Sequence, residues 1–245
     1  MERKDFLKQG LAALGLAAIA PLACSKDVAA LGDTTSTGTD STSTNTGSSS
    51  NACTVTPEET AGPFPTHTPS SLVTNDIRSD RTGVPLTIKI TVNNSNNNCS
   101  ALANAIVDIW HCDKDGNYSE YGGGGMQSSN YTSVHFLRGR QTTDANGLVT
   151  FTSIFPGWYS GRAPHIHVHI YSANGTSLKV TQIAFPTDVC NTVYTTATNY
   201  YTRGTQDTSN DRDNVFADSL ASELATVTGN INDGYVLTHI ITVES

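Results

Sequence analysis

Basic residues are few in this chain of 245 residues, and they never form a run. Lys and Arg number 14 against 22 Asp and Glu, which gives a formal net charge of -8. A protein that binds nucleic acid needs a positively charged surface that neutralises phosphates. The composition therefore excludes DNA and RNA as expected partners.

Long hydrophobic runs are also missing. The apolar stretch at residues 10–20 follows a basic start, residues 2–8 (ERKDFLK), and it is shorter than the roughly 20 residues that a membrane-spanning helix needs. This pattern is typical of a signal peptide, which we place at residues 1–23. Residues 3–8 resemble the twin-arginine export motif with Lys4 at the second arginine, so the sequence does not choose between the general and the twin-arginine routes.

A lipid anchor is the expected link to the membrane. Residues 21–24 (PLAC) resemble the end of a bacterial lipoprotein signal, in which Cys24 becomes the lipidated first residue; ordinary cleavage nearby is the alternative. Residues 33–50 are almost wholly Thr, Ser, Gly, Asn and Asp, so residues 24–52 are predicted to form a flexible tether. We expect an exported protein, periplasmic or on the cell surface, that contacts the membrane only through Cys24.

Helix-favouring residues are scarce, and the folded domain, residues 53–245, is predicted to be all-β. Residues 215–224, capped by Asn214, are the one helix expected, a hairpin turn is expected at residues 144–147, and a sharp turn at residues 113–117. The glycine run at residues 122–125 predicts an irregular loop. Alternation and β-branched residues predict strands at residues 84–92, 105–110, 148–154, 165–171, 178–185 and 235–243, which together indicate a β-sandwich with long loops.

Cysteine is rare too. Four cysteines fall in the folded part, and an even number in an exported domain predicts two disulfides with three pairings left open. Their spacing excludes the zinc knuckle, in which two cysteines lie three positions apart. The four are Cys53, Cys99, Cys112 and Cys190.

Three histidines alternate along one predicted strand. The period of two places His165, His167 and His169 on one face and the apolar residues between them on the other. Imidazoles grouped in this way indicate a metal site, and a polar sheet face with solvated histidines is the alternative. No carboxylate stands near them as an Fe(II) facial triad would need, whereas a three-histidine zinc site stays open.

Four motifs resemble those of the intradiol ring-cleavage dioxygenases, the family of catechol 1,2-dioxygenase and protocatechuate 3,4-dioxygenase. They occur in the family's order and cover roughly residues 53–217. They are residues 57–64 (PEETAGPF), 107–118 (VDIWHCDKDGNY), 156–167 (PGWYSGRAPHIH) and 181–182 (TQ). The resemblance implies the β-sandwich of that family.

The resemblance also implies a site. It assigns Tyr118, Tyr159, His165 and His167 as the ligands of a non-haem Fe(III), and a hard trivalent cation favours the phenolate form of tyrosine. Tyr159 would leave the metal as a catechol binds, while Tyr118 stays bound. Arg162 would stabilise negative charge on the substrate, and Gln182 would hold Arg162 or an oxygen intermediate. The implied reaction opens a catechol between its hydroxylated carbons with both atoms of O2, giving a cis,cis-muconate-type diacid.

Two other functions remain open: an exported zinc or copper site at His165, His167 and His169, and a surface-binding β-sandwich without catalysis. The sequence leaves the catechol unidentified, since Arg138 and Arg140 either face a substrate carboxylate or belong to an ordinary strand and turn. It also leaves open the oligomeric state and any role of His111 or His169. The remaining tyrosines singled out are expected to pack or to line the rim: Tyr121, Tyr131, Tyr200 and Tyr201.

Overall fold

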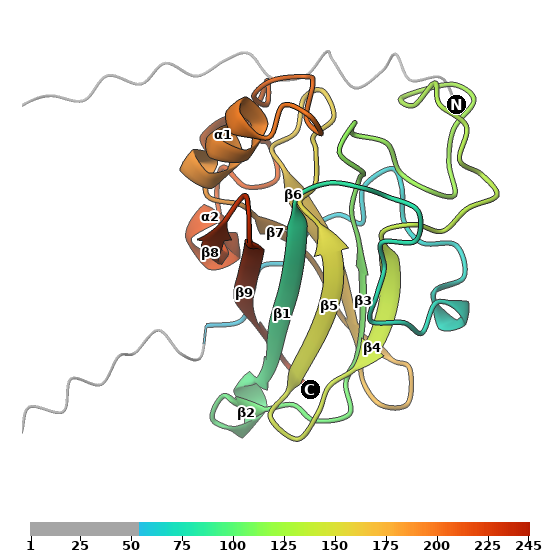
Figure 1. Cartoon of the computed structure of the whole chain (residues 1–245). Helices are drawn as coiled ribbons and strands as arrows, with labels where there is room; N and C mark the ends of the chain where they lie inside the picture. Colours follow the sequence, from blue (N-terminus) through green and yellow to red (C-terminus); the bar gives the residue numbers. More distant parts are fainter. Residues whose placement is uncertain (1–53) are drawn as a thin grey trace, which may run out of the picture. The chain divides into compact units, whose positions relative to one another are not determined.

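Two β-sheets form the part of the chain that the structure, a computed structural model, describes: residues 54–245 (Figure 1). The predicted signal peptide, Cys24, the tether and Cys53 lie outside these residues. One sheet has the order β2 (Ser100–Ala101), β1 (Pro85–Asn94), β9 (Gly234–Val243) and β8 (Thr226–Asn230), with β5 (Leu148–Ile154) also paired to β1. The other has the order β4 (Arg138–Thr142), β3 (Ile106–Trp110), β6 (His165–Tyr171) and β7 (Ser177–Ala184).

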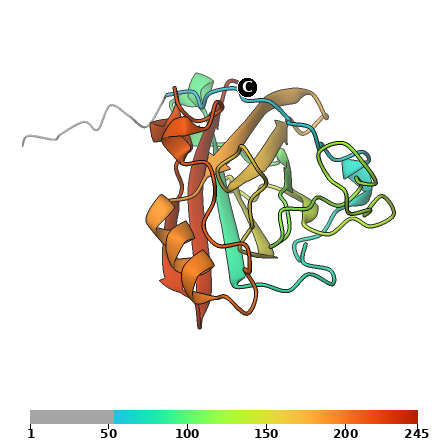
Figure 2. The ribbon, with the colours of Figure 1, turned by 90° about the horizontal axis from the view of Figure 1, so that it is seen from above.

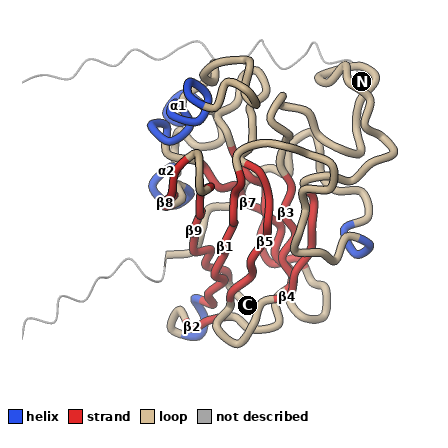
Figure 3. The backbone as a smooth tube through the Cα atoms, in the orientation of Figure 1, coloured by secondary structure: helices blue, strands red, loops and turns tan. Residues whose placement is uncertain are grey.

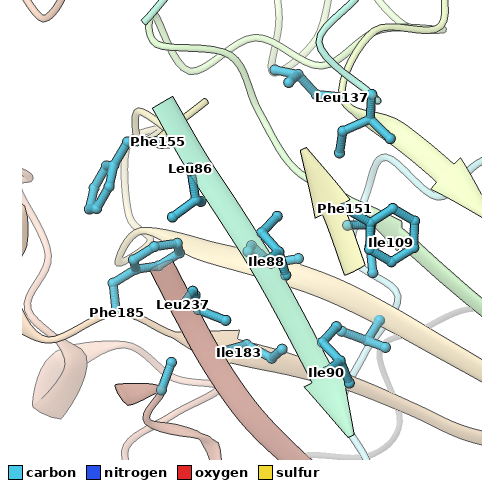
Figure 4. Packing of buried hydrophobic residues seen from close by; sticks show 14 of the residues in the cluster. Leu86, Ile88, Ile90, Ile109, Leu137, Phe151, Phe155, Ile183, Phe185 and Leu237 are labelled. Carbon is cyan, nitrogen blue, oxygen red and sulfur yellow. The ribbon is translucent and has the colours of Figure 1, made fainter. Parts of the chain in front are cut away.

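The hydrophobic core lies between the two sheets. Every second residue of β1 is buried, among them Ile88 and Ile90, and they face Ile109 and Ile183 of the other sheet (Figure 4). Burial of one such side chain stabilises the fold by roughly 1.5–3 kcal/mol relative to an exposed one. The predicted β-sandwich is confirmed.

The strand predictions succeeded where apolar residues alternate. The bounds of β5 and β6 are those expected, and those of β1, β3, β7 and β9 differ by at most two residues. The short strands β2, β4 and β8 were not predicted. Each lies at the end of its sheet order and has a polar sequence, because an edge strand buries less apolar surface than a central one.

The helix prediction was wrong in its extent and incomplete. Within residues 215–224 only α2 (Leu220–Glu223) is helical, and its N-cap is Ser219, not Asn214. The longer α1 (Thr187–Thr196) was missed, because its β-branched sequence hides the buried faces of Cys190, Val193 and Tyr194. Three short 3-10 turns complete the helical part: η1 (Pro69–Ser71), η2 (Ser95–Asn97) and η3 (Asn210–Arg212). Of the helices between residues 54 and 245, none is long and apolar enough to cross a membrane.

The predicted turns are present, but one of them connects different partners. Asp144 accepts hydrogen bonds from the backbone of Asn146 and Leu148. The strands on either side, β4 and β5, belong to different sheets, so the chain crosses the sandwich here and the hairpin prediction was wrong. The second turn closes through Asp113, whose carboxylate accepts from the amides of Asp115 and Asn117.

The prediction of two disulfides among the four cysteines was also wrong. Cys99 is disulfide-bonded, whereas Cys112 and Cys190 are free, buried thiols. They lie in different apolar clusters, Cys190 in the main core and Cys112 beside Trp110 and Tyr118. Burial raises the pKa of both thiols, which therefore remain protonated.

The two sides of the sandwich differ. Helix α1 lies to one side, and the long loop between β3 and β4 lies to the other (Figures 1 and 2). The smooth backbone trace shows how much of the second side is loop (Figure 3). The candidate site lies among these loops, on the outer face of the four-stranded sheet.

Candidate active site

One row of side chains crosses the outer face of the four-stranded sheet. The strand registers pair Arg138 with Trp110, Trp110 with His167, and His167 with Gln182. The apolar neighbours of His167 on β6 point into the core, as the alternation predicts, so the row faces outward. Sheet register thus brings together residues from four separate strands.

The Nε2 atoms of His165 and His167 face each other in the site. His165 Nε2 and His167 Nε2 lie 3.1 Å apart, and His165 Nδ1 donates to the carbonyl of Ala163 at 2.6 Å. That bond leaves the lone pair of His165 Nε2 free. Burial lowers the pKa of His165 to about 3 and that of His167 well below its usual value, so both imidazoles are neutral, the form that binds metals.

Two tyrosines from different loops meet this pair. Tyr118, fully buried beneath the stacked ring of Phe64, places its hydroxyl 3.3 Å from His165 Nε2. The ring of Tyr159 packs edge-on against both Tyr118 and His165, with centroids 5.9 and 5.6 Å away. Burial raises the pKa of both phenols, so each is protonated unless a cation binds it.

The geometry fits a hard metal ion held by mixed oxygen and nitrogen donors. The Nδ1 of His167 is buried with no hydrogen-bond partner in residues 54–245, and its ring stacks on Trp110 at 4.9 Å. Gly62, at φ +67°, passes so close that a Cβ there would lie 2.8 Å from His167 Cε1 and 3.3 Å from Nε2. Only glycine at position 62 leaves the Nε2 of His167 accessible. Two phenols and two imidazoles suit Fe(III).

His169 does not join the group. Its Nε2 is bonded to Ser177 Oγ at 2.8 Å and its Nδ1 to the hydroxyl of Tyr171 at 2.8 Å. Across the described part of the chain, no three His, Cys, Asp or Glu side chains are grouped to hold a metal. The alternative of a three-histidine zinc or copper site therefore has no support in the geometry.

Arg162 is fixed beside the tyrosines. Its Nε lies 2.9 Å from each oxygen of Asp213, its Nη2 donates to Gln182 Oε1 at 2.7 Å, and its Nη1 lies 3.4 Å from the Tyr159 hydroxyl. Asp213 also accepts from the amides of Ala163 and Val215. Sequence reasoning missed Asp213, because it lies 51 residues from Arg162 in a polar loop with no motif of its own.

A cavity of about 440 Å³ opens beside Tyr159 and Arg162. Its walls come from the motif at residues 57–64, the β3–β4 loop, the β5–β6 loop and the segment after Asp213. The lining residues are Thr60, Gly62, Pro63, Met126, Tyr159, Ser160, Gly161, Arg162, Asn214 and Val215. Such a cavity is large enough to admit a small aromatic molecule.

The two arginines that remained open lie elsewhere. Arg140 forms a bidentate pair with Asp108 at 2.5 and 2.7 Å, a partner that sequence reasoning did not find. Arg138 is buried, and donates to Phe64 O, Ser119 O, Ser119 Oγ and Thr66 Oγ1. Neither lines the cavity.

The other residues singled out serve packing. His111 bridges the sheets through Cys112 O and Ser153 Oγ. The hydroxyls of Tyr121 and Tyr201 donate to the carbonyls of Pro65 and Phe155, and Tyr131 and Tyr200 pack against the main core.

Comparison with known proteins points to one family. Residues 61–218 match a family model described as Dioxygenase. An intradiol ring-cleavage dioxygenase from Tetranychus urticae has a similar structure, with TM-score 0.69 and 27% identity over 78% of this chain and 95% of that one. The dioxygenase domain of a dioxygenase carbohydrate-binding protein fusion from Streptomyces sp. SirexAA-E gives 0.53 and 26% over 78% and 99%.

A curated relative matches over a shorter stretch. Chlorocatechol 1,2-dioxygenase from Rhodococcus opacus is 30% identical over 106 residues, which are 36% of this chain and 38% of the relative. The match thus spans well under two thirds of that protein's length.

Proposed function

From the premise that this chain belongs to the intradiol ring-cleavage dioxygenase family, we propose that it opens a catechol-type ring with O2 to give a cis,cis-muconate-type diacid. The observation that carries the proposal is the convergence on His165 Nε2 of the Tyr118 hydroxyl at 3.3 Å and His167 Nε2 at 3.1 Å. This convergence stands beside Tyr159, Arg162 and a cavity.

Tyr118, Tyr159, His165 and His167 are the residues that would hold a non-haem Fe(III). When bound, the ion would supply a Lewis acid that binds the catechol and makes its ring reactive toward O2. Neutral imidazoles and a buried, preformed phenol pair lower the cost of assembling such a site.

The two tyrosines have different surroundings, which supports different roles. Tyr118 is fully buried under Phe64 and does not line the cavity. Tyr159 lines the cavity and lies next to Arg162. As a phenolate, Tyr159 would take one of the two protons that a catechol gives up, and the guanidinium 3.4 Å away favours that charged form.

Arg162 supplies fixed positive charge at the cavity wall. Asp213 and Gln182 hold its guanidinium in one orientation, so it needs no rearrangement as negative charge develops on the ring and its oxygens. Gln182 is itself anchored, because its Nε2 donates to Thr60 O at 2.8 Å.

Purified protein loaded with iron should be red-brown, consume catechol with O2 and release a ring-opened diacid. Tyr159→Phe should keep iron, shift the visible band and slow turnover, whereas Arg162→Ala should keep iron and colour and lose about 10²–10³-fold in turnover. Tyr200→Phe, at a tyrosine that packs against the main core, is the control and should keep the colour. Stoichiometric zinc without a visible band, or no consumption of any catechol, would overturn the proposal.

We also propose export with a lipid on Cys24, supported by the motif at residues 21–24. Cys24→Ser should move the protein from the membrane fraction to the soluble fraction, since acyl chains alone would anchor it. Unchanged fractionation would show that the anchor lies elsewhere.

A further inference from the structure

The charges around the cavity are already paired. Arg162 is the only Lys or Arg among the described residues that line it. Its guanidinium is held by the Asp213 carboxylate and by Gln182, and its remaining nitrogen, Nη1, lies 3.4 Å from the Tyr159 hydroxyl, so its charge is committed to the diol end of the cavity. A substrate carboxylate entering this cavity would lose water and gain no free cation, which is costly.

A carboxylate is bonded to two residues of the cavity wall. Asp207 accepts from Ser160 Oγ at 2.7 Å and from the Gly161 amide at 3.1 Å, and both of these residues line the cavity. Its carboxylate would repel an anionic ring substituent. Arg138 and Arg140, whose role the sequence left open, are held by other partners.

The rest of the wall is neutral and partly apolar. Pro63, Met126 and Val215 line it, and Met126 is 68% exposed. Met126 follows Gly122–Gly125, whose φ angles of 137°, 82°, 159° and 62° suit only glycine. A flexible thioether on such a loop adapts to apolar groups of different shape.

Resting on the proposed function, we propose that the cavity selects neutral catechols with an apolar ring substituent over catechols that carry a carboxylate. Arg162 orients the diol end, and Pro63, Met126 and Val215 contact the substituent. Asp207 disfavours the acid, and among residues 54–245 no unpaired Lys or Arg lines the wall to bind it.

A matched pair of compounds tests this selection: methyl 3,4-dihydroxybenzoate and 3,4-dihydroxybenzoate, which differ in one charge. We expect kcat/KM for the ester to exceed that for the acid at least about tenfold, which corresponds to about 1.4 kcal/mol. Calorimetric titration without O2 should show the same order of Kd. Met126→Lys should lower the ester-to-acid ratio of kcat/KM, because it raises kcat/KM for the acid.

The control places the same charge elsewhere. Val73→Lys changes an apolar residue that is 70% exposed and does not line the cavity, so it should leave the ratio unchanged. Ratios within about threefold for the two compounds, or equal effects of the two lysines, would overturn the inference. If iron-loaded protein consumes no catechol, the proposed function fails, and the two Kd values still decide the selection.

Discussion

Asp213 should support both the stability and the activity of this protein. Its side chain is fully buried, and each of its oxygens lies 2.9 Å from Arg162 Nε. One oxygen also accepts from the Ala163 amide at 2.7 Å and the other from the Val215 amide at 2.9 Å. Asp213→Asn keeps the shape but turns one of these acceptors into a donor.

In the variant, Arg162 therefore loses its charged partner, and the new side-chain amide N–H points at an N–H of Arg162, Ala163 or Val215. A buried donor left unsatisfied costs about 1–3 kcal/mol, and breaking a buried charge pair costs about 3–5 kcal/mol in total. We expect Asp213→Asn to lower the free energy of unfolding by about 3–5 kcal/mol. Because Arg162 keeps Gln182 but loses its main anchor, turnover should fall about 10²-fold, the lower end for one preorganised donor.

Urea unfolding and catechol turnover measure the two effects. The control is Asp207→Asn, the same substitution on the same loop system at an exposed carboxylate that accepts from Ser160 and Gly161. Its loss should be below about 1 kcal/mol. If Asp213→Asn costs no more than Asp207→Asn, the charged clamp on Arg162 contributes nothing and the reasoning is refuted.

Three further changes test other parts of the molecule. Arg138→Met removes four hydrogen bonds from a buried guanidinium and should cost about 3–5 kcal/mol in urea unfolding, against less than about 1 kcal/mol for Arg78→Met at an exposed pair. Gly62→Ala should lower the iron content found by metal analysis far more than Gly204→Ala, because both glycines have φ near +70° but only the first would collide with a neighbour. Burial raises the pKa of Glu223 from 4.5 to about 7, so the folded state holds this proton more tightly than the unfolded state, and stability should fall as pH rises from about 4.5 to 7. Glu223→Gln should remove this part of the pH dependence in urea unfolding, and an unchanged profile would contradict it.

The sequence predicted the strands whose packing is encoded locally. In β6 the histidines alternate with Ile166, Val168 and Ile170, which shows which side chains face outward and which face the core. The bounds of β6 were predicted correctly. The polar edge strand β4 gives no such signal, although it carries Arg138. Helix α1 was missed because its apolar residues recur at helical spacing within a β-branched sequence.

Some residues of the candidate site could be predicted from the sequence, and others could not. The structure brings Tyr118, Tyr159, His165 and His167 together, as the resemblance implied, and their role as ligands stays a prediction. Asp213 was not predictable, because its contact with Arg162 depends on how two distant loops pack. The free thiols of Cys112 and Cys190 show the same limit, since an even count says nothing about which cysteines the fold brings near each other.

One segment that supplies no candidate ligand connects these observations. Residues 60–66, here called the strap, cross the outer face of the four-stranded sheet and are held by hydrogen bonds at both ends. Gln182 donates to the carbonyl of Thr60, and Arg138 donates to Phe64 O and Thr66 Oγ1. Both fastening residues belong to the sheet row that contains His167.

Between these two points the strap has no regular structure, and Tyr121 donates to Pro65 O within it, so its position depends on these three side chains. Gly62 then lies against His167 Cε1, and Phe64 stacks on Tyr118 at 4.6 Å. The side chains of the sheet row therefore fix how close the strap lies to the sheet. The strap in turn limits the space around the His167 imidazole and the Tyr118 phenol. A change at Arg138 should reach the site by this route, through the position of Phe64 on Tyr118.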